Sequence, residues 1–142
     1  MTTPDYASLV AAATQARLRA YAPYSHFAVG AVALSSSGLL FPGCNIENAA
    51  YPATTCADRI ALFNAYAAGE RDIVALAIVA DTLGPVSPCG TCRQVIFELA
   101  PHAVVILANL RGQQRITTPL ELLPDGFSSS RLQEAQSSLP LS

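Results

Sequence analysis

The chain has 142 residues, which is enough for one compact domain with a hydrophobic core and too few for two domains of ordinary size. Apolar residues make up 51% of it and charged residues only 13%, so little polar surface remains and we expect subunit interfaces. The formal charge is −2, and the eight basic residues, all of them arginines, are scattered along the chain. This distribution argues against polymeric nucleic acid as a partner.

The first residues contain no basic stretch, and the apolar run from Leu9 to Ala13 is too short for a signal peptide or a membrane span. We therefore expect a cytoplasmic protein with no membrane contact. In that reducing compartment the four cysteines are more consistent with metal ligands or core residues than with a disulfide framework.

The first half of the chain predicts a helix, a hairpin and a second helix. Pro4 suits the first turn of a helix, and Gly69 is a typical helix stop. The turn Ser35–Gly38 separates two apolar runs. The expected elements are a helix from Pro4 to about Tyr21, strands over 29–34 and 39–46, and a helix over 56–68.

The second half predicts alternating strands and helices. Pro101 ends the third helix, and Pro124 follows a short helical turn. The alternation indicates an α/β fold, and we expect one domain over 1–142 with its core at about 5–127 and a polar C-terminal tail. The expected elements are strands over 73–80, 104–110 and 114–118, a helix over 89–99 and a turn over 120–123.

Three of the four cysteines form a pattern typical of a catalytic zinc site. Cys89 and Cys92 form a C-x-x-C pair at one predicted helix start, and Cys56 lies at another, where the positive helix end favours thiolates. Three protein ligands leave a fourth position for water, whereas structural zinc is normally closed by four. The alternatives are a structural site completed by Cys44, which lies inside a predicted strand, and a thioredoxin-like redox pair, although no redox-domain pattern surrounds the two cysteines.

Three thiolates on one Zn²⁺ leave a net charge near −1, which weakens the ion as a Lewis acid. Arg59 and Arg93 each follow a cysteine motif at a helix start. We expect their guanidinium groups to donate to the ligand sulfurs; the alternative is that they are solvated surface arginines.

Further polar residues complete a family pattern. Three segments resemble the signature motifs of the small zinc-dependent cytidine deaminases, in the family's order and spacing: Asn45–Asn48, Cys56–Arg59 and Pro88–Gln94. The loop Pro23–Phe27 and the segment Leu122–Pro124 before Phe127 match as well, so the resemblance spans roughly residues 20 to 130.

The resemblance implies a three-layer α-β-α sandwich around a five-stranded mixed sheet, and a homotetramer with shared active sites. It implies one Zn²⁺ ion per subunit, bound by Cys56, Cys89 and Cys92. It also implies that a cytosine nucleoside is contacted by Phe27, Asn45, Glu47, the backbone near Ala57, and Phe127 from a neighbouring subunit.

The implied reaction is hydrolytic deamination of cytidine and deoxycytidine, in which zinc-bound hydroxide attacks C4 and ammonia leaves. A carboxylate beside the zinc must carry the protons. The family has glutamate there, and this chain has Asp58. The intrinsic pKa values of the two acids differ by about 0.4, whereas a misplacement of about 1 Å can cost about a hundredfold in rate, so we expect Asp58 to be a slow proton shuttle.

Asp58 leaves other interpretations open. Its shorter side chain leaves room for an N4-substituted or otherwise altered cytosine as the substrate. The chain could instead be a catalytically weak nucleoside-binding variant. A third class of function is an interaction module with a structural zinc ion. Deaminases of cytosine-nucleoside antibiotics are not expected to carry the Asn45–Asn48 segment. Polynucleotide-editing deaminases typically use a histidine ligand where this chain has Cys56.

Overall fold

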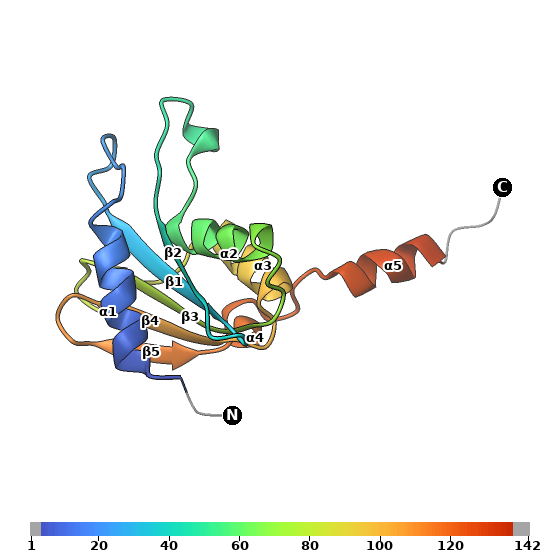
Figure 1. The fold of residues 1–142 in the computed structure, drawn as a ribbon. Helices are drawn as coiled ribbons and strands as arrows, with labels where there is room; N and C mark the ends of the chain where they lie inside the picture. The colour runs from blue at the N-terminus through green and yellow to red at the C-terminus, as the bar shows by residue number, and fades with distance from the viewer. Residues whose placement is uncertain (1–3, 138–142) are drawn as a thin grey trace.

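The computed structural model describes residues 4–137, and its order of elements follows the expected alternation (Figure 1). The helices are α1 (Tyr6–Arg17), α2 (Ala57–Ala67), α3 (Gly90–Leu99), α4 (Pro119–Leu122) and α5 (Ser129–Ser137), with a short 3-10 helix at Tyr51–Ala53. The strands are β1 (Val29–Ser35), β2 (Leu40–Cys44), β3 (Ile73–Ala80), β4 (Val104–Asn109) and β5 (Gln114–Thr117).

The strands form one five-stranded mixed sheet in the order β2-β1-β3-β4-β5. Strand β1 runs antiparallel to β2 and β3, β3 runs parallel to β4, and β4 is antiparallel to β5. The parallel pair requires a crossover connection, and α3 supplies it. The predicted five-stranded mixed sheet is therefore confirmed.

Helices cover both faces of this sheet, because its central strands are apolar on both sides. In β3, Leu76 and Ile78 belong to the core under α2 and α3, whereas Ala75 and Val79 belong to the core under α1. Figure 1 shows α1 on one side of the sheet and α2 with α3 on the other, while α5 extends away from the body. The three-layer arrangement is confirmed.

The first helix is shorter than predicted at both ends. Its N-cap is Asp5, whose carboxylate accepts from the backbone of Ala7 at 3.1 Å, so Pro4 lies before the helix; Thr3 lies outside the described residues. At the other end the backbone bonds shorten to three-residue spacing. Tyr21 instead donates from its backbone nitrogen to the carbonyl oxygen of Asn45, 3.0 Å away, which draws the chain out of the helix.

Glycine allows α2 to lie close against β2. A Cβ atom at Gly43 would fall 2.4 Å from the carbonyl oxygen of Ala57 and 2.5 Å from the backbone nitrogen of Ala61. Only a residue without a Cβ atom fits there, so the glycine fixes the height of the first turn of α2 over the sheet. None of the helices among residues 4–137 is long and apolar enough to cross a membrane.

Candidate active site

Three thiols meet where α2 and α3 begin. Cys56 is the N-cap of α2 and Cys89 the N-cap of α3, and the Cys89 sulfur accepts from the backbone nitrogen of Cys92 at 3.4 Å. The three Sγ atoms all lie within 4.8 Å of one another, and those of Cys89 and Cys92 are 3.2 Å apart. Two helix N-termini therefore direct their positive ends at one sulfur cluster.

The geometry of this cluster fits a tetrahedral zinc ion. Bonds of about 2.3 Å to sulfur place tetrahedral ligands about 3.8 Å apart, which is compatible with Sγ separations of no more than 4.8 Å. Cys44, at the end of β2, is not part of the cluster, and burial raises the pKa of its thiol. The cluster thus offers three ligands and an open fourth position, which contradicts the structural site completed by Cys44.

The surroundings of Cys56 favour its thiolate form. Hydrogen bonding from Cys92, together with Arg59, lowers the pKa of Cys56 to about 5 despite partial burial. The Nη2 atom of Arg59 lies 3.4 Å from the Cys56 Sγ. Arg59 therefore contacts the sulfur as predicted.

The structure corrects the expectation for Arg93. Its guanidinium donates to the carbonyl oxygens of Pro88 and Leu122, at 2.9 and 2.8 Å, and to the Ser87 hydroxyl at 2.7 Å. With Nε, Nη1 and Nη2 engaged on these oxygens, Arg93 supports the loop before Cys89 rather than neutralising a thiolate.

Asp58 lies beside the sulfur cluster on the first turn of α2. Its side chain is 3% exposed, and its Oδ2 atom has no hydrogen-bond partner among the described residues. Burial raises the pKa of this carboxyl, and the Cys56 thiolate adds to the effect. A buried carboxyl with a free oxygen can hold a proton and pass it to a group in front of it.

A cavity of about 260 Å³ opens in front of the three thiols and Asp58. It is mostly apolar, with a few polar groups that converge on it, as is usual for small-molecule sites. Besides the cysteines and Asp58 it is lined by Ser25, Phe27, Val29, Asn45, Glu47, Thr54, Ile78, Val86, Ser87 and Pro88.

The predicted nucleoside contacts Phe27, Asn45 and Glu47 therefore lie in one cavity with the thiols. Ala57 is fully buried in the first turn of α2 and is not among the lining residues of this cavity, so its predicted backbone contact stays a prediction. Phe127 is not among the lining residues of this cavity; it is 59% exposed on the segment after α4, so its predicted role in a neighbouring subunit stays a prediction.

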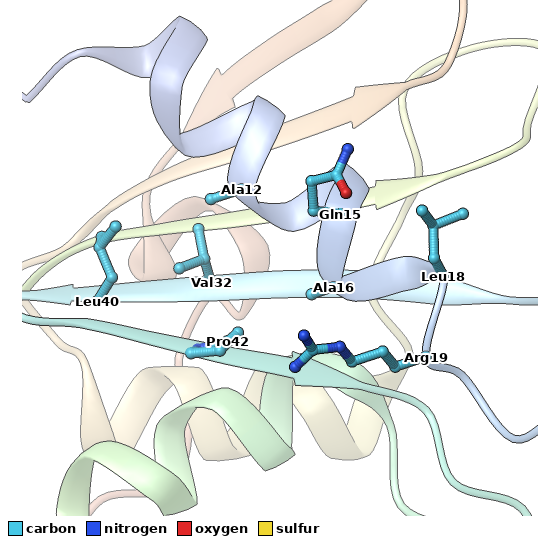
Figure 2. A pocket seen from close by; sticks show the side chains of 8 residues that line it. All are labelled: Ala12, Gln15, Ala16, Leu18, Arg19, Val32, Leu40 and Pro42. Carbon is cyan, nitrogen blue, oxygen red and sulfur yellow. The ribbon is translucent and has the colours of Figure 1, made fainter.

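A second hollow, of about 360 Å³, lies between α1 and the edge strand β2 (Figure 2). Figure 2 shows apolar side chains such as Leu18 and Leu40 along it, with Arg19 and Gln15 as polar members. Its lining contains no thiol or carboxylate, so it lacks groups for acid–base or metal chemistry. We therefore place the site in the cavity at the cysteine cluster.

The family model of the cytidine and deoxycytidylate deaminase zinc-binding region matches residues 4–108. The chain belongs to this zinc-dependent deaminase family. It is 51% identical to a cytidine deaminase of Sporosarcina psychrophila over 92% of this chain and 97% of that protein. It is 50% identical to one of Halalkalibacterium halodurans over 92% of this chain and 99% of that protein.

The fold agrees with a solved member of the family. A crystal structure of cytidine deaminase from Burkholderia pseudomallei matches with a TM-score of 0.85 and 49% identity, over 87% of this chain and 100% of that chain. Together with the three-thiol cluster, family membership establishes zinc as the cofactor, with one ion per chain. A redox role for the C-x-x-C pair has no support from these matches.

Sequence reasoning did not assign several residues that shape the cavity. Val86, Ser87 and Pro88 form a wall through the loop that precedes the Cys89 cap, and Ser25 lines the cavity beside Glu47. Pro88 lies inside a recognised motif, so its position was a usable signal. Ser25 also lies inside a matched segment, the loop Pro23–Phe27, but a serine in a loop is ordinary turn chemistry and did not by itself indicate a role.

Proposed function

We propose that this chain catalyses the hydrolytic deamination of cytidine and deoxycytidine, releasing ammonia and leaving uridine and deoxyuridine. The observation that carries the proposal is the convergence of Cys56, Cys89 and Cys92 with the Asp58 carboxyl in one cavity. The direct test is incubation of the zinc-loaded protein with cytidine, followed by ultraviolet absorbance and by ammonia release.

We propose Cys56, Cys89 and Cys92 as the zinc ligands. When bound, zinc acts as a Lewis acid that lowers the pKa of a water molecule and makes it nucleophilic near neutral pH. Arg59 donates to the Cys56 thiolate and withdraws part of its negative charge, which keeps the site electrophilic.

Asp58 moves the protons in this proposal. It accepts a proton from the attacking water and gives it to ring nitrogen N3 of the cytosine; it then takes the proton of the new C4 hydroxyl and delivers it to the leaving amine. The new C4–O bond becomes the carbonyl of uridine, and the C4–N bond breaks to release ammonia. The raised pKa of Asp58 suits a group that must hold a proton between these steps.

The lining of the cavity favours a nucleoside over a nucleotide. Glu47 lines both this cavity and the hollow beside it, which also includes Tyr24, Tyr51 and Thr54. Neither lining contains a lysine or arginine among the described residues. A phosphate placed there would meet a carboxylate and no cation, so an uncharged sugar is the better fit.

A second candidate substrate class is an N4-substituted cytosine nucleoside. The observation in its favour is the short Asp58 side chain, whose Oδ2 atom has no partner among the described residues and which occupies less of the cavity than glutamate would. The test compares turnover of N4-methylcytidine and cytidine by the native protein and by Asp58→Glu. If the rate for N4-methylcytidine relative to that for cytidine falls in the glutamate form, this substrate class is supported. If that relative rate is unchanged, the class is rejected.

The remaining alternative is nucleoside binding with little turnover. Calorimetry with a zinc-directed hydrated nucleoside analogue separates it from a structural-zinc module. Tight binding without measurable turnover supports a binding protein, and absence of binding supports an interaction module.

A homotetramer with shared sites is also proposed, together with a cytoplasmic location and a single domain over 1–142. Large apolar side chains are exposed at several places, which suits burial between subunits. These include Leu18, Tyr51, Leu83, Leu120 and Phe127. We propose that Phe127 enters the site of a neighbouring subunit and packs on the base.

A further inference from the structure

Glu47 does more than line the cavity, because its carboxylate holds the loop that precedes β1. Its Oε1 atom accepts from the backbone nitrogens of Tyr24 and Ser25, at 2.9 and 3.1 Å. Its Oε2 atom accepts from the Ser25 hydroxyl. Three donors from two adjacent loop residues therefore converge on one half-buried carboxylate.

The same loop is fixed at a second place by Asn45. The Oδ1 atom of Asn45 accepts from the backbone nitrogen of Val29 at 2.8 Å, and its Nδ2 atom donates to the carbonyl oxygen of Phe27 at 2.7 Å. The Ser25 oxygen also accepts from the backbone nitrogen of Phe27 at 3.0 Å. Ser25 thus links the Glu47 carboxylate to Phe27, which also lines the cavity.

A count of acceptor sites shows what remains for a ligand. An ionised carboxylate offers about four acceptor positions, and three of those on Glu47 are taken by the loop. A freely rotating carboxylate would distribute the remaining acceptor position over many directions. Because different donors bind its two oxygens, the Glu47 carboxylate is held in place and presents its remaining acceptor position in one direction.

We propose that Ser25 is a positioning residue, whose hydroxyl holds the Glu47 carboxylate in the orientation that accepts a hydrogen bond from a sugar hydroxyl of the substrate. This inference rests on the proposed function, since it assigns Glu47 to the sugar. Ser25 itself lines the cavity, so it occupies the wall at which that contact would form.

The charge of Glu47 agrees with this arrangement. The Ser25 hydroxyl lowers the pKa of Glu47, the backbone amides of Ser25 and Tyr24 lower it further, and the nearby His26 contributes in the same direction. Glu47 therefore stays ionised, and remains an acceptor, at lower pH than an ordinary glutamate. Removal of the hydroxyl must raise this pKa toward its usual value.

The test is kinetic and uses the zinc-loaded protein with three variants. Ser25→Ala removes the donor, Ser25→Thr keeps a hydroxyl, and Ser37→Ala removes a matched hydroxyl that donates to Glu70 at 2.8 Å, remote from the cavity. We expect Ser25→Ala to raise KM for cytidine about tenfold with kcat within about twofold, because it removes a hydrogen bond to a charged group. Ser25→Thr should restore KM, and Ser37→Ala should leave it unchanged.

A second readout does not depend on turnover. Carboxyl-carbon NMR titration of Glu47 should show its pKa raised in Ser25→Ala and close to native in Ser25→Thr and Ser37→Ala. An unchanged Glu47 pKa, or a Ser25→Ala variant that loses kcat with KM unaltered, overturns the positioning role. If no variant deaminates cytidine, the proposed function fails, while the titration still decides whether Ser25 controls Glu47.

Discussion

The guanidinium of Arg93 donates a 2.8 Å hydrogen bond to the carbonyl oxygen of Leu122, which joins α3 to the C-terminal segment. The next residue, Gln94, donates to the carbonyl oxygen of Phe127 at 2.9 Å. Because Arg93 also holds Pro88 and the cavity wall, one side chain links the metal loop to the segment that carries Phe127.

We expect Arg93→Lys to lower stability by about 2 kcal/mol, because a lysine ammonium cannot reproduce three bonds made by a rigid fork. KM for cytidine should rise as the wall loosens. Thermal unfolding and steady-state kinetics measure the two effects, with Arg111→Lys at an exposed site as the control. If Arg93→Lys has the same stability and the same KM as the native protein, the hydrogen bonds of Arg93 are dispensable.

Gly43→Ala should damage both stability and activity. Its Cβ would lie 2.4 Å from the Ala57 carbonyl oxygen, so α2 must move away from β2 at a cost of about 1–3 kcal/mol. This helix carries Cys56 and Asp58, so kcat should fall with the melting temperature. Gly84→Ala, whose Cβ meets nothing within 4 Å, is the matched control and should behave as native.

Zinc removal should lower the melting temperature as well as abolish activity, because three thiolates at two helix starts are held together by one ion. Chelation followed by calorimetry provides the measurement. A melting temperature that chelation leaves unchanged would argue against the three-thiol site.

Arg59→Gln should bind zinc less tightly and lower kcat by about tenfold, since it loses the charged donor to Cys56. Metal analysis of the variant provides the measurement.

A shared active site predicts complementation between two inactive variants. Cys89→Ala lacks a metal ligand, and Phe127→Ala lacks the aromatic ring proposed to enter the neighbouring site. Mixed oligomers place an intact metal site beside an intact Phe127, so co-refolding should restore part of the activity that neither variant has alone. Light scattering should give four times the mass of one chain. No recovery from mixed subunits of that size would place Phe127 outside the neighbouring site.

The sheet and the metal cluster could be predicted because each rests on local pattern. Ile73–Ala80 is a continuous apolar run, and the structure places that strand at the same residues. Cys56, Cys89 and Cys92 are N-terminal to or inside the first turns of predicted helices, and topology then brings the two helix starts together.

The errors and omissions involve contacts between distant segments. The helix end near Arg17 depends on the backbone hydrogen bond from Tyr21 to Asn45, which no local pattern encodes. The role of Arg93 depends on Leu122, which lies 29 residues further along the chain. The charge of three thiolates led us to expect both arginines at the sulfurs, but Arg59 contacts sulfur whereas Arg93 binds backbone and hydroxyl oxygens.

The most direct test of the account is the rate of cytidine deamination by the native protein beside its Asp58→Glu form, both loaded with zinc. If Asp58 is the proton shuttle held too far from its partner, glutamate should raise kcat by about a hundredfold, which is the effect of restoring about 1 Å of reach. A native protein already as fast as the glutamate form would contradict that account, and would show that the cavity is built around aspartate.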